Sequence, residues 1–208
     1  MSDFGTMKSR VAGEMKRGDL TVCASAVATA ILSAIARLER KRFHFNEVVG
    51  LVVSASSSST YVSLPATLLM VDSVRTTIGS RDYTLRAAPW GVINDVDSGQ
   101  YFGYPSYYSL KGTQLRLYPP PNQDMPLTIS GTQQLTEVSA AATAAATNAW
   151  MTDAEEMVRC LAKSFLFRDE VRNPQLQSWF ETESMKAERE LKRQSTNRQT
   201  SRLRLSTI

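Results

Sequence analysis

The stretch YYSLKGTQLRLY, residues 107–118, carries the clearest β-hairpin signal of the chain. A Lys-Gly pair at its centre can form the turn, and Leu115 and Leu117 share a face because alternate side chains of a strand point to the same side. Residues 119–121 are prolines, which end the pairing since proline has no amide hydrogen to donate. The stretch therefore predicts antiparallel β structure in the middle of the chain.

The same alternation extends to both sides of this hairpin. Residues 61–65 fit a strand that a proline ends, and residues 74–85 fit two strands joined by a Gly-Ser turn. Leu127 and Ile129 would place another inward-facing pair on a later strand. We expect residues 46–138 to form one small antiparallel β domain.

Before this domain, apolar residues recur with the period of an α-helix. Phe4, Met7 and Val11 recur at helical spacing, which predicts a first amphipathic helix. In a second helix, five apolar residues would share one face: Cys23, Val27, Ile31, Ile35 and Leu38. We therefore expect residues 1–45 to form a helical hairpin.

Helical signals return after the β domain. An alanine- and threonine-rich segment, residues 139–151, is expected to be a linker. Residues 152–155, Thr-Asp-Ala-Glu, have the sequence of a capping box that starts a helix, and the Asn-Pro pair at 173–174 separates this helix from the next. We predict that residues 152–194 form helices that pack with residues 1–45.

The expected fold class is therefore α+β. N- and C-terminal helices form a bundle, a small antiparallel β unit is inserted between them, and residues 195–208 form an extended tail. With 42% hydrophobic and 21% charged residues, the composition is typical of a soluble globular protein. Residues 24–36 are apolar but too few to span a bilayer, so we expect neither a membrane span nor a signal peptide. Cys23 and Cys160 are too far apart in sequence to suggest a disulfide scaffold or a zinc site.

Signatures of enzymes are missing from the sequence. It contains neither a phosphate-binding loop nor a dinucleotide-binding glycine motif. The one histidine, His44, has no nucleophile or acid assigned to it by spacing, and we expect it to be structural. Glu155 and Glu156 fit a first helical turn, where carboxylates favour the dipole, and the aromatic residues of 101–108 are expected to pack in the core and loops of the β unit. We expect no catalytic, cofactor-binding or metal site, and no enzyme activity.

The C-terminal residues 192–208 hold five basic and no acidic residues in a chain whose net charge is +4. In a strand, Leu203 and Leu205 would lie on one side and the arginines beside them on the other. A single strand cannot satisfy its own backbone, so we expect a flexible tail that pairs with a sheet edge of a partner. Two alternatives remain: a solvated disordered tail, and an arm that binds DNA independently of sequence with a strong salt dependence.

The order of these parts resembles that of the head-to-tail adaptor (connector, or neck) proteins of tailed bacteriophages. The resemblance spans about residues 4–191, and it depends on the order and spacing of several turn and strand motifs rather than on any one of them. They are FNE at 45–47, YVSLP at 61–65, VDSV at 71–74, GYPSYY at 103–108, LRLYPPP at 115–121 and NAWMT at 148–152.

The resemblance implies a structural virion protein. Adaptors of this kind form a homo-oligomeric ring, here expected to hold twelve copies, which attaches to the portal and continues the DNA channel toward the tail. The implied partners are the portal protein, downstream tail, nozzle or head-closure proteins, and the genomic double-stranded DNA in the lumen, with no membrane. The implied location is the head-tail junction of the virion, after assembly in the host cytoplasm.

Two groups of residues are candidates for these contacts. The first group belongs to the C-terminal tail and would dock onto the portal or another partner: Arg198, Arg202, Leu203, Arg204, Leu205 and Ile208. The second group is basic and would line the DNA channel or an interface: Arg37, Arg40, Lys41, Arg42, Lys192 and Arg193.

Overall fold

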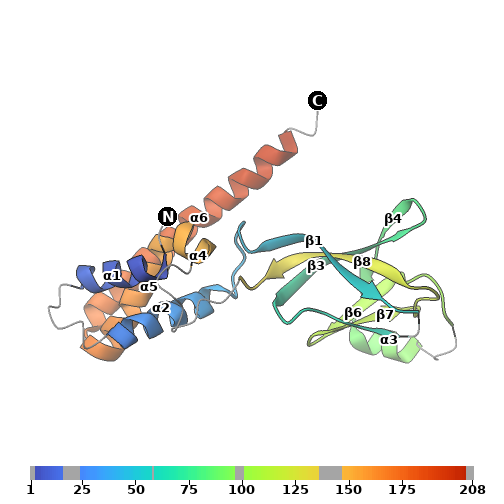
Figure 1. Ribbon diagram of the computed structural model, residues 1–208, viewed down its shortest axis with the longest axis horizontal. Helices are drawn as coiled ribbons and strands as arrows, with labels where there is room; N and C mark the ends of the chain where they lie inside the picture. The colour runs from blue at the N-terminus through green and yellow to red at the C-terminus, as the bar shows by residue number, and fades with distance from the viewer. Residues whose placement is uncertain (1–2, 16–23, 58, 97–100, 136–146, 205–208) are drawn as a thin grey trace. The chain divides into compact units, whose positions relative to one another are not determined.

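The computed structural model describes residues 3–15, 24–57, 59–96, 101–135 and 147–204 (Figure 1). The chain divides into two compact units. One unit combines Met1–Phe45 with Leu135–Ile208, and the other is Asn46–Gln134. The first unit is helical and the second consists mostly of strands, so the expected α+β class is confirmed, with helices toward both ends of the sequence and strands in its centre.

The helical unit draws its helices from both parts of the sequence. Helix α1 is Phe4–Glu14 and α2 is Ala24–Leu38; α4 is Ala149–Thr152 and α5 is Glu155–Leu166, followed by a π-helical turn at Phe167–Val171 and by α6, Pro174–Arg204. The apolar faces predicted for the first two helices are buried: Phe4, Met7 and Val11 of α1, and Val27, Ile31, Ile35 and Leu38 of α2. They form one core with Met157, Leu161 and Phe165 of α5. Cys23 lies outside the described residues.

The start of the C-terminal helices differs from the prediction. Asn148 caps α4, since its side chain accepts a hydrogen bond from the Trp150 backbone nitrogen at 3.0 Å. Trp150 and Met151 are then fully buried in the helical core. The expected linker, residues 139–151, therefore cannot extend into α4, and its residues 139–146 lie outside the described part. The predicted capping box is also wrong, because Ala154 is the N-cap of α5 and makes no side-chain cap bond.

The break before α6 occurs where it was predicted. After the π-helical turn, Arg172 adopts a left-handed conformation with φ 54°, which ends the preceding helix. The Asn173 side chain then accepts a hydrogen bond from the Leu176 backbone nitrogen at 3.1 Å and caps α6. Pro174 suits the first helical position because the amide hydrogen that it lacks would have no intrahelical partner there.

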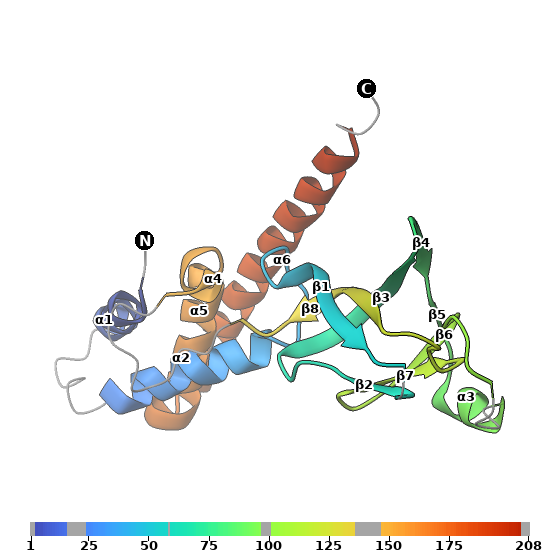
Figure 2. The same cartoon turned by 45° about the vertical axis from the view of Figure 1, so that its right-hand side comes forward.

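The β unit is built from two four-stranded sheets (Figures 1 and 2). The first sheet has the order β1-β8-β3-β4, with β1 at Glu47–Ala55, β8 at Met125–Gln133, β3 at Leu68–Ile78 and β4 at Arg81–Thr84. The second has the order β2-β7-β6-β5, with β2 at Tyr61–Ser63, β7 at Gln114–Tyr118, β6 at Tyr107–Lys111 and β5 at Arg86–Ala87. Helix α3, Trp90–Val96, follows β5. All pairings are antiparallel except β5 with β6.

The hairpin at the centre of the sequence forms as predicted. Strands β6 and β7 pair from Tyr107 with Tyr118 to Lys111 with Gln114, and Gly112 makes the turn with φ 61°, a conformation that favours glycine. Leu115 and Leu117 are fully buried, although Arg116 between them is buried as well. Apolar residues of both sheets form one core: Ala55, Val62, Val74, Leu85, Tyr108, Leu115, Leu117, Met125, Leu127 and Ile129.

The C-terminal segment is not the extended tail that the sequence suggested. Helix α6 continues through residues 195–204, so Arg198, Arg202, Leu203 and Arg204 lie in a helix and cannot pair there as a strand. A helix satisfies its backbone through its own i to i−4 hydrogen bonds, whereas a strand needs a partner chain. Leu205 and Ile208 lie outside the described residues.

Gly131 offers a direct test of the packing between β8 and β3. A Cβ atom at this position would lie 1.9 Å from the backbone oxygen of Met70, which cannot move away as a flexible side chain could. We expect Gly131→Ala to lower the free energy of unfolding of the β unit by about 1–3 kcal/mol, the usual cost of overpacking. Chemical denaturation followed by circular dichroism would measure it.

The matched control is Gly91→Ala in α3. No heavy atom outside its own helix backbone and chain neighbours lies within 4 Å of a Cβ built at Gly91, and alanine favours helices over glycine by about 1 kcal/mol. Equal effects of the two substitutions would contradict the close approach of Met70.

Candidate interaction surfaces

The predicted basic residues near the end of α2 form ion pairs with α6. Arg37 Nη2 lies 3.1 Å from Glu181 Oε1, and Lys41 Nζ contacts Glu188 Oε2. Lys192, another member of the predicted basic group, lies 2.8 Å from the other oxygen of Glu188. These contacts join the end of α2 to the middle of α6, so the structure brings together residues that are about 150 positions apart in sequence.

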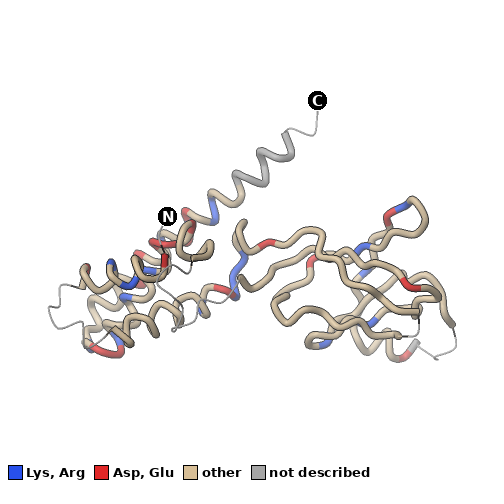
Figure 3. Tube along the Cα trace, in the orientation of Figure 1, with Lys and Arg blue, Asp and Glu red and all other residues tan. Residues whose placement is uncertain are grey.

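The remaining basic candidates are placed on the same unit. Arg193 pairs with Glu190 at 3.3 Å, and Arg40 and Arg42 are exposed just beyond α2. Figure 3 shows basic and acidic positions interspersed over the helical unit. Four of the six predicted cations, Arg37, Lys41, Lys192 and Arg193, therefore have a carboxylate partner within the chain. Such pairing weakens the net positive potential that attracts DNA phosphates.

Glu188 is the carboxylate on which two of these cations converge. Its burial favours the neutral form, but hydrogen bonds from Lys192 and Lys41 outweigh that effect and hold the pKa of Glu188 below its ordinary value. The side chain is only 14% exposed, so solvent screens these contacts less than it does at the surface. Sequence reasoning missed Glu188 because the pairing depends on the packing of α2 against α6.

The side chain of His44 contacts residues of α6 and of the end of α4. Its Nδ1 lies 3.0 Å from Ser195 Oγ, and its Nε2 lies 3.8 Å from Asp153 Oδ2. The Ser195 hydroxyl donates to the Leu191 carbonyl at 2.9 Å, so Nδ1 must be the donor toward Ser195 Oγ. Because the hydroxyl hydrogen of Ser195 is donated to the Leu191 carbonyl, His44 is not placed to remove it, and this pair does not make Ser195 a nucleophile. The contacts hold the segment after α2 against α6 and the end of α4.

A charge cluster that the sequence did not reveal, centred on the buried Lys163, joins α1 to α5. Lys163 is almost fully buried, and its Nζ lies 2.6 Å from Glu14 Oε2 and 4.4 Å from the centre of the Phe180 ring. Arg159 Nη1 reaches the other oxygen of Glu14 at 3.0 Å. Helical periodicity alone would place a lysine in solvent, so only the folded packing identifies this cluster.

The aromatic residues of the β unit are divided between its core and its surface. Tyr108 is buried in the core, whereas Tyr101, Phe102, Tyr104 and Tyr107 are exposed, so of these five residues only Tyr108 belongs to the core.

A buried arginine instead organises the packing around α3. The Arg116 guanidinium lies 5.6 Å from the ring centres of both Tyr61 and Trp90 and donates to Asn94 Oδ1 at 2.6 Å. These contacts tie α3 to β2 and β7, and they use Arg116 as a packing group rather than as a free cation.

The residues of the described part of the chain also bear on metal binding, membrane insertion and thiol chemistry. Among these residues, no group of three or more histidine, cysteine, aspartate or glutamate side chains could hold a metal ion. The helices in the same part include none that is long and apolar enough to cross a membrane. Cys160 is buried with a free thiol, and burial raises its pKa, which fits a packing role rather than a reactive one.

Acid should weaken the contact between α2 and α6. Because the pKa of Glu188 is lowered in the folded state, its contribution to stability is complete above the unfolded-state pKa and is lost as the pH falls through the folded-state pKa. We expect Glu188→Gln to cost about 1–2 kcal/mol of unfolding free energy at pH 7, and the difference from the unmodified chain to shrink as the pH falls toward 3. Urea denaturation at a series of pH values would measure it.

Glu190→Gln is the matched control, because Glu190 lies on the same helix, is half exposed and pairs with the exposed Arg193. It should change stability by less than about 0.5 kcal/mol at any pH. A difference for Glu188→Gln that did not depend on pH would contradict the role of its charge.

Comparison with known proteins bears on the whole chain. The family model described as SU10 adaptor protein matches residues 2–206. No curated protein matches the sequence. The match covers both the helical unit and the inserted β unit, and it makes the chain a phage adaptor protein and a virion component that contacts other virion proteins. The chain belongs to the SU10 adaptor protein family, which confirms the resemblance to phage head-to-tail adaptors found in its sequence.

Proposed function

We propose that the protein forms a closed ring, of about twelve copies, that attaches to the portal at the head-tail junction and continues the DNA channel toward the tail. The observation that carries the proposal is the adaptor family match over residues 2–206, which spans both the helical unit and the β unit. A ring follows naturally when each copy binds the next through two different surfaces, since a repeated head-to-tail contact closes if its rotation permits.

The C-terminal end of α6 is the proposed portal-docking element. Among the side chains described, Leu191 is the last residue of α6 in the helical core, and the helix continues to Arg204 beyond it (Figure 1). A helix that extends past its own core offers its surface to a groove of another protein. Arg198, Arg202, Leu203, Arg204, Leu205 and Ile208 remain the candidates, now with residues up to Arg204 acting from a helix instead of a strand.

The basic residues give less support to DNA binding as the main function. Arg37, Lys41, Lys192 and Arg193 each have a carboxylate partner within the helical unit. Neutralising phosphates with these side chains would require breaking those pairs, which opposes tight binding. We therefore propose that DNA passes through the lumen without a strong contact to these side chains.

Native mass spectrometry of the purified protein, alone and with the portal, tests the ring and its partner. We expect one defined oligomer, or one that forms on adding portal. A protein that stays monomeric with and without portal would refute the proposal. Tight binding to unrelated duplexes whose affinity falls about 10³-fold or more from 50 to 200 mM salt would instead favour sequence-independent DNA binding.

Removal of residues 199–208 tests the docking element. The deletion removes no side chain of the described core, and it leaves Ser195 in contact with His44. We expect an unchanged melting temperature and at least a tenfold loss of portal affinity, measured by surface plasmon resonance. Full portal affinity after the deletion would contradict docking by this end of α6.

A further inference from the structure

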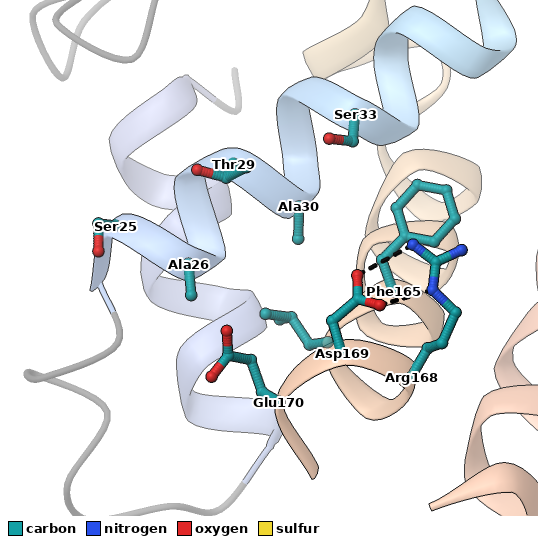
Figure 4. A pocket seen from close by; sticks show the side chains of 10 residues that line it. Ser25, Ala26, Thr29, Ala30, Ser33, Phe165, Arg168, Asp169 and Glu170 are labelled. Atoms are coloured by element: carbon teal, nitrogen blue, oxygen red, sulfur yellow. Dashed lines mark hydrogen bonds and ion pairs between the residues drawn. The ribbon is translucent and has the colours of Figure 1, made fainter. Parts of the chain in front are cut away.

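A groove in the helical unit lies between α2 and the π-helical turn that follows α5. Its volume is about 340 Å³. Figure 4 shows Ala26 and Ala30 pointing from α2 toward the carboxylates of Asp169 and Glu170 on the other side. The side chains that α2 contributes are all alanine, serine or threonine, so the groove is left open by small residues rather than filled.

The wall opposite α2 is held in place. Arg168 donates two hydrogen bonds to Asp169, at 2.7 and 2.9 Å, and its guanidinium lies 4.9 Å from the centre of the Phe165 ring. The lining is mixed: alanines, Phe165 and Leu166 alternate with hydroxyl groups and with two carboxylates, which suits one large side chain that combines an apolar ring with a hydrogen-bond donor.

A patch on α6 has the matching chemistry. Trp179 is 55% exposed, and Leu176, three residues earlier on the same face, is 40% exposed. The Trp179 ring packs edge-on against Phe180 at 4.6 Å, and Phe180 in turn stacks on the buried Phe167 at 5.3 Å. Trp179 is therefore supported from behind while most of its indole is in solvent.

The groove and the patch lie on different sides of the helical unit. Glu181 of α6 pairs with Arg37 of α2, so that face of α6 looks toward α2. Successive helical residues are rotated by about 100°, which places Trp179 about 200° away from Glu181 and thus facing away from α2. One molecule therefore cannot fill its own groove with its own tryptophan.

We propose that Trp179 and Leu176 of one copy dock into the groove between α2 and the π-helical turn of the next copy. This inference rests on the proposed ring and names the contact that closes it. An indole that becomes buried needs an acceptor for its N–H group, and Asp169 and Glu170 provide carboxylate oxygens at the rim. Glu183 lies four residues after Trp179 on the same face of α6, but Lys186 pairs with it at 2.7 Å, which offsets its charge as the patch approaches these carboxylates. Two distinct surfaces on each copy give a head-to-tail contact, which a ring requires.

The test uses one variant of each surface in the full-length chain. Trp179→Ala removes the inserted side chain, and Ala26→Phe fills the groove. We expect each to weaken the contact at least about 30-fold, as loss of a central tryptophan does at other interfaces, so that both stay monomeric at a concentration where the unmodified protein is fully assembled. Native mass spectrometry gives the stoichiometry, and circular dichroism confirms that each variant is folded.

A mixture of the two variants gives the sharpest outcome. The Trp179→Ala chain keeps its groove and the Ala26→Phe chain keeps its tryptophan, so one junction can form and the mixture should yield heterodimers but no ring. Tyr83→Ser, which removes an exposed aromatic residue of β4, is the control and should assemble normally.

Rings of normal size from Trp179→Ala alone would overturn the proposed contact while leaving the ring itself intact. An unmodified protein that is monomeric alone and with portal would instead refute the ring, and the contact with it. If Ala26→Phe does not fold, Trp179→Ala still decides the question.

Discussion

The architecture depends on an aromatic cluster at the point where the chain leaves the helical unit for the β unit. Phe43 and Phe45 stack at 5.4 Å, and Trp150 meets both rings edge-on at 5.7 and 4.9 Å. Phe43 and Phe45 precede the β unit and Trp150 follows it, so their burial holds the two ends of the insertion in one core. The Trp150 Nε1 group is buried without a hydrogen-bond partner in the described structure, a cost of about 1–3 kcal/mol that the packing of three rings must exceed.

Because the aromatic cluster holds the two ends of the insertion together, each unit can form its own core and its own backbone hydrogen bonds. The strands satisfy their backbones within two sheets around their own core, while the helices use a different core and a set of ion pairs from α2 and α5 to α1 and α6. Because loop-closure entropy grows only slowly with length, an insertion of this size adds little cost once its ends are held. Loss of one partner costs most where the remaining charge is buried, as at Lys163 and Glu188.

Periodicity explains which features could be predicted from the sequence. The apolar spacing of α1 and α2 and the alternation in β7 depend on local geometry, which a single sequence displays directly. The missed features depend on distant partners. Trp150 was assigned to a linker because its alanine-rich neighbours have no period, and Lys163 and Arg116 are buried only because Glu14 and Asn94 reach them from other elements. The groove of α2 had no sequence signal beyond its small residues, whose meaning depends on what packs opposite them.

The C-terminal segment illustrates how local and tertiary effects compete. The alternation of leucine and arginine favoured a strand, but α6 had already formed a helix with cap, core and ion-pair support as far as Lys192. Once a helix is nucleated, each added residue gains a backbone hydrogen bond without a partner chain, and residues 195–204 have no proline or glycine to stop it. A strand would have to give up these bonds before gaining any from a partner. If this segment docks as proposed, its backbone would already be helical before contact, and less entropy would be lost on assembly.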